Sequence, residues 1–301
     1  MTKPVWGSVC PEPAASATER TLLRVHCTVL LRAKAPPSVG RMNLAYDDLG
    51  SGRPVLLVHG HPFDRSMWRP QAERLARSGY RVVTPDLRGY GQSATKDTKT
   101  GLDVFAQDLV GLAGHLGLDR FVLGGLSMGG QIVMQLAKDH PERVRALLLA
   151  DTFAGLDTPQ AKQARYDTAD RVTEEGMERY AEELLPKMIS KQTRATRPDV
   201  EAHVRTMMRN APGKGAAAAL RGRAERPDYT NSLKAVEVPT LVVVGSEDEF
   251  TPVADAELIH REIRTSTLVV VEGAGHLPNL ERETEFDEAL STFLKNSGAT
   301  P

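Results

Sequence analysis

Short apolar runs alternate with longer amphipathic stretches along the chain from Met42 onward. Each run is continuously apolar, which is typical of strands buried on both faces of a parallel sheet. The amphipathic stretches between the runs are typical of the helices that connect parallel strands. The pattern therefore predicts an α/β fold with a mostly parallel, doubly wound sheet. The expected strands are Pro54–Val58, Arg81–Thr84, Arg120–Leu123, Val144–Leu149, Thr240–Val244 and Thr267–Val271.

One long segment interrupts this alternation. Residues 152–233 are rich in Ala, Glu, Arg and Met, lack a strand-like apolar run, and are punctuated by prolines that favour short helices. In an α/β sheet protein, such an insertion lies over the carboxyl ends of the strands, where ligands bind. We therefore expect a core of residues 42–151 and 234–301 and a helical cap of residues 152–233. The candidates for an apolar pocket in the cap, or for simple helix core, are Tyr166, Met177, Tyr180, Met188, Met207 and Met208.

Residues 1–41 differ in composition from the rest of the chain. They hold both cysteines, Cys10 and Cys27, and their apolar patch is broken by Arg24 and His26. A secretory signal peptide needs an uninterrupted apolar region, so we expect a flexible N-terminal extension instead, with Met42 as an alternative start of the native protein. Because the remaining chain offers no cysteine for a disulfide, we expect a cytoplasmic location.

Composition narrows the classes of partner. The 301 residues carry a formal net charge of −1, with acidic and basic residues interspersed. This balance argues against a nucleic-acid partner or an anionic membrane surface. No apolar stretch approaches the roughly 18 residues that would span a bilayer. The sequence carries no signature of an oligomeric state.

The most informative segment is Gly125-Leu126-Ser127-Met128-Gly129, which follows a predicted strand and precedes a predicted helix. In this context Gly-x-Ser-x-Gly is a nucleophile elbow, a turn so sharp that small residues must flank the serine. The turn lifts the hydroxyl above the carboxyl edge of the sheet, and the positive end of the following helix points at it. We therefore expect Ser127 to be a nucleophile. The alternative is a glycine-rich turn that serves packing alone.

A serine hydroxyl needs a base to accept its proton, and the base needs a third group to hold its tautomer. His276 follows the last predicted strand within Gly273-Ala274-Gly275-His276, and Asp248 follows the preceding strand. Both loops are expected at the same edge of the sheet as Ser127. The chain order serine, acid, histidine is that of α/β hydrolases and differs from the orders of two unrelated serine-protease families.

Structural interpretations of these residues remain open at this point. Asp248 lies just before a predicted helix start, and His276 is also explained as a hydrogen-bonded loop histidine. Glu247 and Glu249 are neighbouring acids, and Asp151 follows another strand as a rival acid position. The agreement of all three residue types with one catalytic order favours the triad Ser127, Asp248 and His276.

Acyl transfer also needs two backbone donors for the oxyanion. The amide of Met128, directly after the nucleophile, is the first candidate. The second is the amide of His61, in the loop that follows an early strand, where Gly60 permits a tight turn. Only His59 lies at a spacing that would support metal binding by His61, so we favour pocket lining for that side chain and expect no metal.

From about residue 42 to residue 294 the chain resembles the α/β hydrolase superfamily, in particular bacterial esterases, cofactor-free perhydrolases related to haloperoxidases, and 3-oxoadipate enol-lactonase-like enzymes. The resemblance implies a sheet of about eight strands with a helical cap after strand 6. It implies Ser127 as nucleophile, His276 as base and Asp248 as orienting acid. It also implies an oxyanion hole of the His61 and Met128 amides, and no cofactor. The segments that carry it are His59-Gly60-His61-Pro62, Asp86 to Ser93, Gly125 to Gly130, Leu149 to Thr152 and Gly273 to His276.

These features predict a carboxylesterase, a serine hydrolase that cleaves small-molecule carboxylic esters through an acyl-enzyme. The serine at position 127 argues against haloalkane dehalogenases and epoxide hydrolases, which resemble this chain but use an aspartate there. The alternatives are an enol-lactonase-like lactonase, a cofactor-free perhydrolase or haloperoxidase, and a C–C bond hydrolase. A ligand receptor built on the same fold is the non-enzymatic alternative, because a fold alone does not determine a function.

Overall fold

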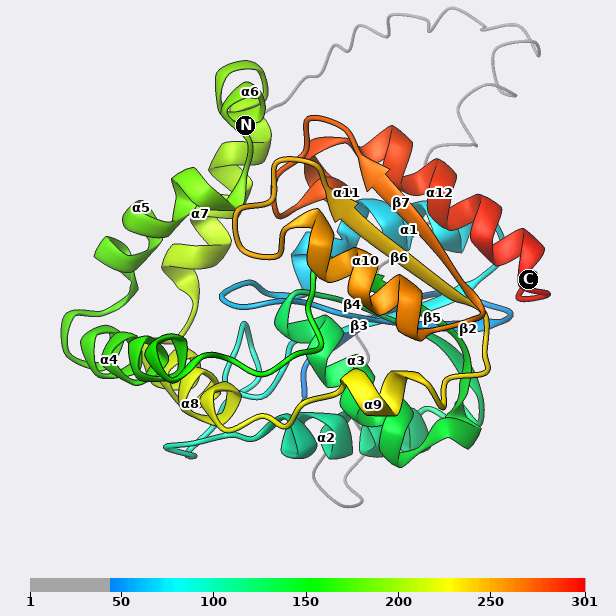
Figure 1. Cartoon of the computed structure of the whole chain (residues 1–301), viewed down its shortest axis with the longest axis horizontal. Helices are drawn as coiled ribbons and strands as arrows, with labels where there is room; N and C mark the ends of the chain where they lie inside the picture. The colour runs from blue at the N-terminus through cyan, green and yellow to red at the C-terminus, as the bar shows by residue number, and fades with distance from the viewer. Residues whose placement is uncertain (1–43, 301) are drawn as a thin grey trace, which may run out of the picture. The chain divides into compact units, whose positions relative to one another are not determined.

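The computed structural model of the protein describes residues 44–300. Its centre is one sheet of seven strands in the order β1-β3-β2-β4-β5-β6-β7. Strand β1 runs antiparallel to β3, and every other neighbouring pair is parallel. Figure 1 shows this sheet with helices on both sides. The strands are β1 (Tyr46–Gly50), β2 (Pro54–Val58), β3 (Arg81–Pro85), β4 (Phe121–Leu126), β5 (Val144–Ala150), β6 (Thr240–Gly245) and β7 (Ser266–Val271).

The predicted α/β class is confirmed, and all six expected strands are present. The sequence pattern missed β1, because this half-buried edge strand reads Tyr-Asp-Asp-Leu-Gly and lacks an apolar run. The seven strands of residues 44–300 are close to the expected eight. The helical insertion follows the fifth of these strands and not the sixth, because five strands precede it in the described part of the chain.

Each strand contributes to two apolar cores, because successive side chains point to opposite faces of a sheet. In β2, Leu56 and Val58 pack into one core, and Val55 and Leu57 pack into the other. The first core lies beneath α2 (Leu102–His115), α3 (Met128–Asp139) and α10 (Val253–Glu262), and the second beneath α1 (Arg69–Arg77) and α12 (Glu283–Asn296). Three short elements complete the core, η1 (Arg65–Trp68), η2 (Pro141–Arg143) and α11 (Pro278–Glu281).

The strand order brings several loops to one edge of the sheet. Strand β4 lies between β2 and β5. At its carboxyl end, Gly125 pairs with Val58 of β2, and Leu126 pairs with Ala150 of β5. Since β2, β4, β5, β6 and β7 are parallel, the loops that follow them open at the same edge. This is the edge at which α/β sheets bind ligands.

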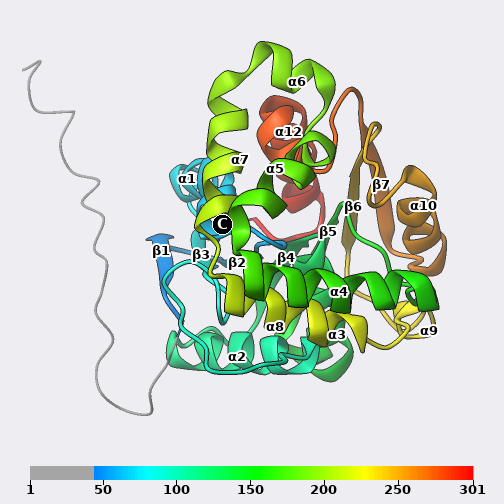
Figure 2. The same cartoon turned by 90° about the vertical axis from the view of Figure 1, so that its left-hand side faces the viewer.

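The chain between β5 and β6 is helical, and we call its helices α4 to α8 the cap. Helix α4 packs against α8, and α5 packs against α7. Figure 2 shows these helices in front of the sheet, over the carboxyl ends of its strands. The bounds of the core and cap domains stay predictions, and the predicted extension of residues 1–41 lies outside the described residues. The helices of this part are α4 (Pro159–Glu175), α5 (Met177–Met188), α6 (Lys191–Thr196), α7 (Pro198–Asn210), α8 (Gly213–Ala224) and α9 (Thr230–Leu233).

Within residues 44–300, no helix combines the length and the apolar character that crossing a membrane requires. The cytoplasmic location stays a prediction from the sequence.

Candidate active site

Ser127 occupies the turn between β4 and α3 in a backbone conformation that non-glycine residues seldom adopt. Its φ is 58° and its ψ is −119°. The turn is fixed from both sides, because Ser127 N donates to Ala150 O at 2.9 Å and Thr152 Oγ1 donates to Ser127 O at 2.8 Å. Such strain at one side chain is typical of functional sites.

The glycines of the motif are required by close backbone contacts. A Cβ atom on Gly125 would lie 2.4 Å from the carbonyl carbon of Gly129. A Cβ atom on Gly129 would lie 2.3 Å from the carbonyl oxygen of Val58. Neither distance allows a side chain, so the Gly-x-Ser-x-Gly sequence is what lets the elbow pack against β2.

His276 and Asp248 form a buried, hydrogen-bonded pair. His276 Nδ1 lies 2.7 Å from Asp248 Oδ2, and both residues are almost fully buried. With Nδ1–H donating to the carboxylate, the second ring nitrogen is left to accept a proton. His276 and Ser127 line the same cavity. No hydrogen bond between Ser127 Oγ and His276 Nε2 is present within residues 44–300, and such bonds often tighten only when substrate binds.

The loop that carries His276 is anchored to the cap by Glu281. The buried Glu281 carboxylate accepts hydrogen bonds from Gly275 N at 2.9 Å and from Ser190 N at 2.7 Å. His276 N donates to Met188 O of α5 at 3.2 Å. The position of the histidine therefore depends on both the core and the cap.

The surroundings of Asp248 favour its ionised form. Burial alone raises the pKa of the Asp248 carboxyl, but the nearby His276 and the hydrogen bonds from His276 and Thr251 outweigh burial and leave the pKa below its ordinary value. Phe250 N also donates to Asp248 Oδ1 at 2.8 Å. Asp248 is therefore a carboxylate at pH 7.

The rival acid Asp151 lies in the same cluster but has different partners. Asp151 Oδ1 accepts a hydrogen bond from Gly245 N at 2.9 Å, and Oδ2 has no hydrogen-bond partner within residues 44–300. Burial, followed by the negative charge of Asp248, raises the pKa of Asp151 well above its ordinary value. His276 donates to Asp248 and not to Asp151, so the geometry favours Asp248 as the acid that orients the base.

The two expected oxyanion donors lie close to the elbow. A Cβ atom on Gly60 would lie 2.9 Å from Leu126 O, so only glycine lets the loop after β2 approach Ser127 so closely. Within residues 44–300, no hydrogen-bond acceptor is found for the backbone N–H groups of His61 and Met128. Two uncommitted amides are what an oxyanion hole needs, and their assignment stays a prediction.

The side chain of His61 is engaged by two tyrosines. Its Nδ1 lies 2.7 Å from Tyr90 Oη, and its Nε2 lies 3.1 Å from Tyr180 Oη of the cap. Burial and, next, the positive charge of Arg223 hold the pKa of His61 well below its usual value. His61 lines the cavity as a neutral, hydrogen-bonded ring, and both ring nitrogens of His59 bind backbone groups.

One group of side chains in the described part of the chain has the spacing of a metal site. Asp151, Asp248 and His276 offer ligand atoms within 4.8 Å of one another. However, His276 Nδ1 and Asp248 Oδ2 bind each other, and Asp248 accepts further hydrogen bonds from its own loop. This pattern fits an acid–base pair better than a set of ligands.

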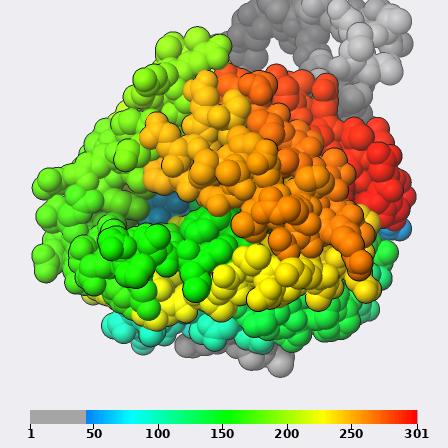
Figure 3. All heavy atoms as spheres, in the orientation of Figure 1, coloured from blue at the N-terminus to red at the C-terminus, as the bar shows by residue number. Residues whose placement is uncertain are grey.

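The cavity above Ser127 has a volume of about 270 Å³ and lies between the core and the cap. Figure 3 shows an opening between the green helices of the cap and the orange segment of the core. Of the candidate pocket residues, Tyr180 and Met188 line the cavity. Met207 and Met208 are buried in the second apolar core instead, and Tyr166 donates to Glu225 at the surface of the cap.

Sequence reasoning missed the charged residues of the cavity wall. Arg165, Arg223 and Asp157 line the cavity together with apolar side chains such as Phe153. The only sequence signal was a pair of arginines, Arg221 and Arg223, after the alanine run of α8. Which arginine of the cap faces the cavity depends on tertiary packing, so composition and spacing did not identify it.

The Asp86 to Ser93 segment is held together by hydrogen bonds and an ion pair. Asp86 accepts hydrogen bonds from Arg65 N at 2.9 Å and Gln92 N at 2.8 Å, and it forms an ion pair with the Arg65 side chain. Ser93 Oγ donates to Asp86 O at 2.8 Å. The segment shapes the loop after β3.

The known family described as "alpha/beta hydrolase fold" matches residues 53–283 of the chain. The chain belongs to the α/β hydrolase family. Among solved structures, this α/β hydrolase is similar to a malate-bound thermophilic esterase from Thermogutta terrifontis. The identity is 43%, the TM-score is 0.82, and the match covers 84% of this chain and 93% of the esterase.

Two relatives of this α/β hydrolase carry other names. It is 30% identical to 3-oxoadipate enol-lactonase 2 of Acinetobacter baylyi, over 76% of this chain and 84% of the relative. It is 29% identical to a putative non-heme chloroperoxidase of Synechocystis, over 86% of this chain and 99% of the relative. The resemblance to this branch of the superfamily is confirmed, and the names of the relatives span three activities.

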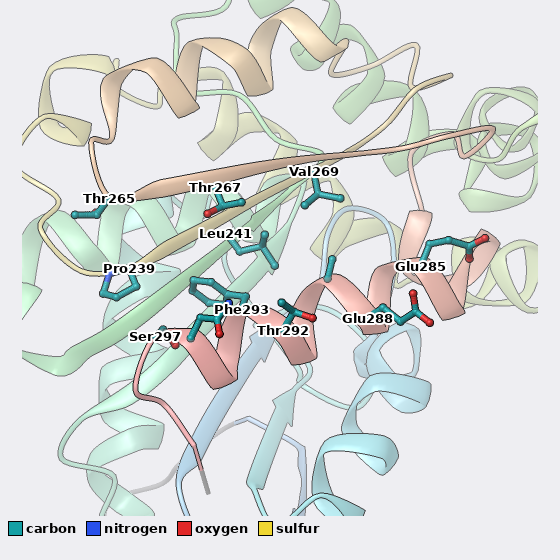
Figure 4. Close-up of a pocket in the computed structure, with 12 residues that line it drawn as sticks. Pro239, Leu241, Thr265, Thr267, Val269, Glu285, Glu288, Thr292, Phe293 and Ser297 are labelled. Atoms are coloured by element: carbon teal, nitrogen blue, oxygen red, sulfur yellow. The ribbon is translucent and has the colours of Figure 1, made fainter.

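A second, larger cleft of this α/β hydrolase is not lined by any residue of the elbow. It measures about 500 Å³ and runs between the edge strand β7 and helix α12. Figure 4 shows Thr267 and Val269 on one side of it and Phe293 and Glu288 on the other. None of the candidate catalytic residues lines this cleft, so the smaller cavity at Ser127 is the candidate active site.

Proposed function

We propose that this protein is a carboxylic ester hydrolase that uses Ser127, His276 and Asp248 as a catalytic triad. The observation that carries the proposal is the buried His276–Asp248 hydrogen bond of 2.7 Å in a cavity shared with a serine on a strained strand-to-helix turn. These are a nucleophile, a base and a group that orients the base. The esterase and lactonase relatives support a hydrolytic reaction.

In the proposed reaction, Ser127 Oγ attacks the ester carbonyl carbon while its proton passes to His276 Nε2. The amides of His61 and Met128 stabilise the negative charge on the carbonyl oxygen. His276 then donates the proton to the leaving alkoxide, and Asp248 stabilises the imidazolium. Water repeats the cycle on the acyl-enzyme, which releases the acid and regenerates Ser127.

A lactone would react in the same way, with the leaving hydroxyl still attached to the acyl group. The similarity to 3-oxoadipate enol-lactonase 2 makes lactone hydrolysis the second candidate function. Perhydrolysis also shares the triad, because hydrogen peroxide then replaces water in the second half of the reaction. Peroxide-dependent bromination in acetate buffer separates perhydrolysis from hydrolysis.

Replacement of the nucleophile tests the proposal. We expect Ser127→Ala to lower kcat/KM for p-nitrophenyl esters by at least about 10⁴-fold, because the attacking oxygen is removed. The exposed and distant Ser78→Ala variant is the matched control and should keep full activity. The panel should span short to long acyl chains and simple lactones, and the small cavity predicts a preference for short chains.

The thermal unfolding midpoint of Ser127→Ala should stay close to that of the wild type, because the Ser127 hydroxyl has no hydrogen-bond partner within residues 44–300. Retained ester turnover in the folded Ser127→Ala protein would refute the nucleophile assignment. Tight retention of a ligand without turnover by the wild type would support the receptor alternative instead.

A further inference from the structure

Arg223 is a buried cation whose two terminal nitrogens have no partner in the described part of the chain. It lies near the end of α8, is 8% exposed, and lines the cavity that holds Ser127 and His276. Its Nε donates to Gln131 Oε1 of helix α3 at 2.8 Å. Within residues 44–300, neither terminal nitrogen has a hydrogen-bond acceptor or a carboxylate within ion-pair distance. The guanidinium is therefore held in place from the nucleophile helix while two of its nitrogens stay available.

The neighbouring arginines differ, because both contact Asp157. Arg165 makes a two-pronged contact, with Nε 2.7 Å from Oδ2 and a terminal nitrogen 3.0 Å from Oδ1. Arg226 approaches the same carboxylate at 3.5 Å. The single negative charge of Asp157 is thus shared by Arg165 and Arg226, and Arg223 has no counter-ion among residues 44–300. Glu225, which follows the last residue of α8, pairs with Lys162 instead.

A buried, unpaired guanidinium is costly, because it loses hydration without gaining an equivalent partner. The ring of Phe153 compensates only in part, since it lies 5.9 Å from Arg223 and closer, at 4.4 Å, to Arg226. Burial, followed by the charges of Arg165 and Arg226, lowers the pKa of Arg223. A ligand carboxylate would offset the cost of burying the unpaired guanidinium, because its two oxygens match the fork of guanidinium nitrogens.

We propose that Arg223 binds a carboxylate of the substrate, so that the preferred substrate is an ester or lactone that also carries a free carboxylate. The inference rests on the proposed function, since it places that carboxylate in the same cavity as the reacting carbonyl. Arg165 is a positioning residue here, because it pairs with the Asp157 carboxylate and so keeps that carboxylate from pairing with Arg223. Half esters of short dicarboxylic acids are the simplest members of this substrate class.

The kinetic test compares two esters that differ mainly in charge. Mono-p-nitrophenyl glutarate and p-nitrophenyl valerate have acyl chains of the same length, but only the first carries a carboxylate. We expect the wild type to prefer the glutarate ester. Arg223→Met should lower kcat/KM for the glutarate ester about 10- to 100-fold, the range expected for a hydrogen bond to a charged group, and change the valerate ester by less than about threefold.

Arg221→Met is the matched control, because Arg221 lies on the same helix but pairs with Asp170 and does not line the cavity. It should leave both esters unchanged. Equal losses on both esters in Arg223→Met, or no loss on the glutarate ester, would overturn the proposal. If Arg223→Met does not fold, the wild-type preference and Arg223→Lys, which keeps the charge without the fork, decide the question. Arg223→Lys should lose part of the preference for the glutarate ester over the valerate ester. A wild type that favours the valerate ester would refute the proposal.

A binding measurement separates this inference from the proposed function. Glutarate is titrated into Ser127→Ala, with and without Arg223→Met, and followed by nuclear magnetic resonance. We expect Arg223→Met to weaken glutarate binding at least about tenfold. This result would support the carboxylate site even if no ester were hydrolysed. Equal glutarate affinity in both proteins would refute the carboxylate site even if Ser127 proved to be the nucleophile.

Discussion

At the scale of single residues, the pKa values of two buried carboxyl groups near His276 are shifted in opposite directions. Hydrogen bonds from His276 and Thr251 help to outweigh the cost of burial at Asp248 and keep its pKa low. At Asp151, burial and the adjacent Asp248 charge raise the pKa. Divergent pKa values in neighbouring acids often mark different roles. We therefore assign Asp248 as the ionised partner of the base and Asp151 as a neutral neighbour.

Exchange of each acid for its amide tests this assignment. Asp248→Asn should lower kcat/KM by about 10³- to 10⁴-fold, because the amide favours the wrong imidazole tautomer. Asp151→Asn should stay within about tenfold of the wild type, because an amide there replaces a neutral carboxyl. Steady-state kinetics on p-nitrophenyl butyrate measures both. A larger loss in Asp151→Asn than in Asp248→Asn would reverse the two roles.

The raised pKa of Asp151 also predicts a pH-dependent stability. Below the unfolded-state pKa, near about 4, the carboxyl is protonated in both states and folding bears no cost. As the pH rises above this value, the unfolded state ionises first, so stability is lost until the folded pKa is reached. Asp151→Asn removes this loss.

The Asp151→Asn variant should therefore gain stability relative to the wild type as the pH rises from about 4 toward the raised folded-state pKa of Asp151, by up to about 1.4 kcal/mol per pH unit. Urea unfolding of both proteins at several pH values measures the difference. A stability difference that stays constant across this range would mean that Asp151 is ionised in the folded protein.

At the scale of elements, the nucleophile elbow shows how far local sequence determines structure. Continuous apolar runs identified β2, β4 and β5, because burial on both faces leaves no polar position. Catalytic candidates were found where a reactive side chain directly follows a strand, as at Ser127 and Asp248. The two elbow glycines were recognisable from the motif, because only glycine fits where Gly125 meets the backbone of Gly129 and where Gly129 meets the backbone of β2.

The features that the sequence did not predict depend on contacts between distant segments. Strand β1 pairs only with β3 at the sheet edge, so it needs no apolar run. The free guanidinium of Arg223 results from Asp157 contacting Arg165 and Arg226, which lie on either side of α8 in the sequence. Spacing along the chain does not reveal which of several arginines is left without a carboxylate.

The tight elbow predicts a large cost for one added methyl group. Gly129→Ala would place a Cβ atom 2.3 Å from Val58 O, which is backbone and cannot rotate away. We expect a loss of at least about 2 kcal/mol in the free energy of unfolding, together with loss of activity. Chemical denaturation measures the change.

Gly114→Ala is the control for Gly129→Ala, because Gly114 lies in helix α2 with open space around its Cβ position. This variant should gain about 0.5–1 kcal/mol, since alanine restricts the unfolded chain more than glycine does. A Gly129→Ala protein as stable as the wild type would contradict the close packing of the elbow.

At the scale of the whole molecule, the core and the cap contribute different parts of the candidate active site. Core loops present Ser127, Asp248 and His276 at one edge of the sheet, and the cap closes a cavity of about 270 Å³ above them. The cap also contributes Tyr180 and Arg223 to the wall of the cavity. The core is thus suited to the reaction and the cap to the choice of substrate.

The central claim is that Ser127 is the nucleophile, and covalent labelling tests it without knowledge of the substrate. A fluorophosphonate reacts with an activated serine, which forms a bond to phosphorus as fluoride leaves. Intact-protein mass spectrometry should show one adduct on the wild type and none on Ser127→Ala. Peptide mass spectrometry after digestion should place the adduct on the peptide that contains Ser127. A wild type that stays unlabelled, or an adduct that persists in Ser127→Ala, would contradict the claim.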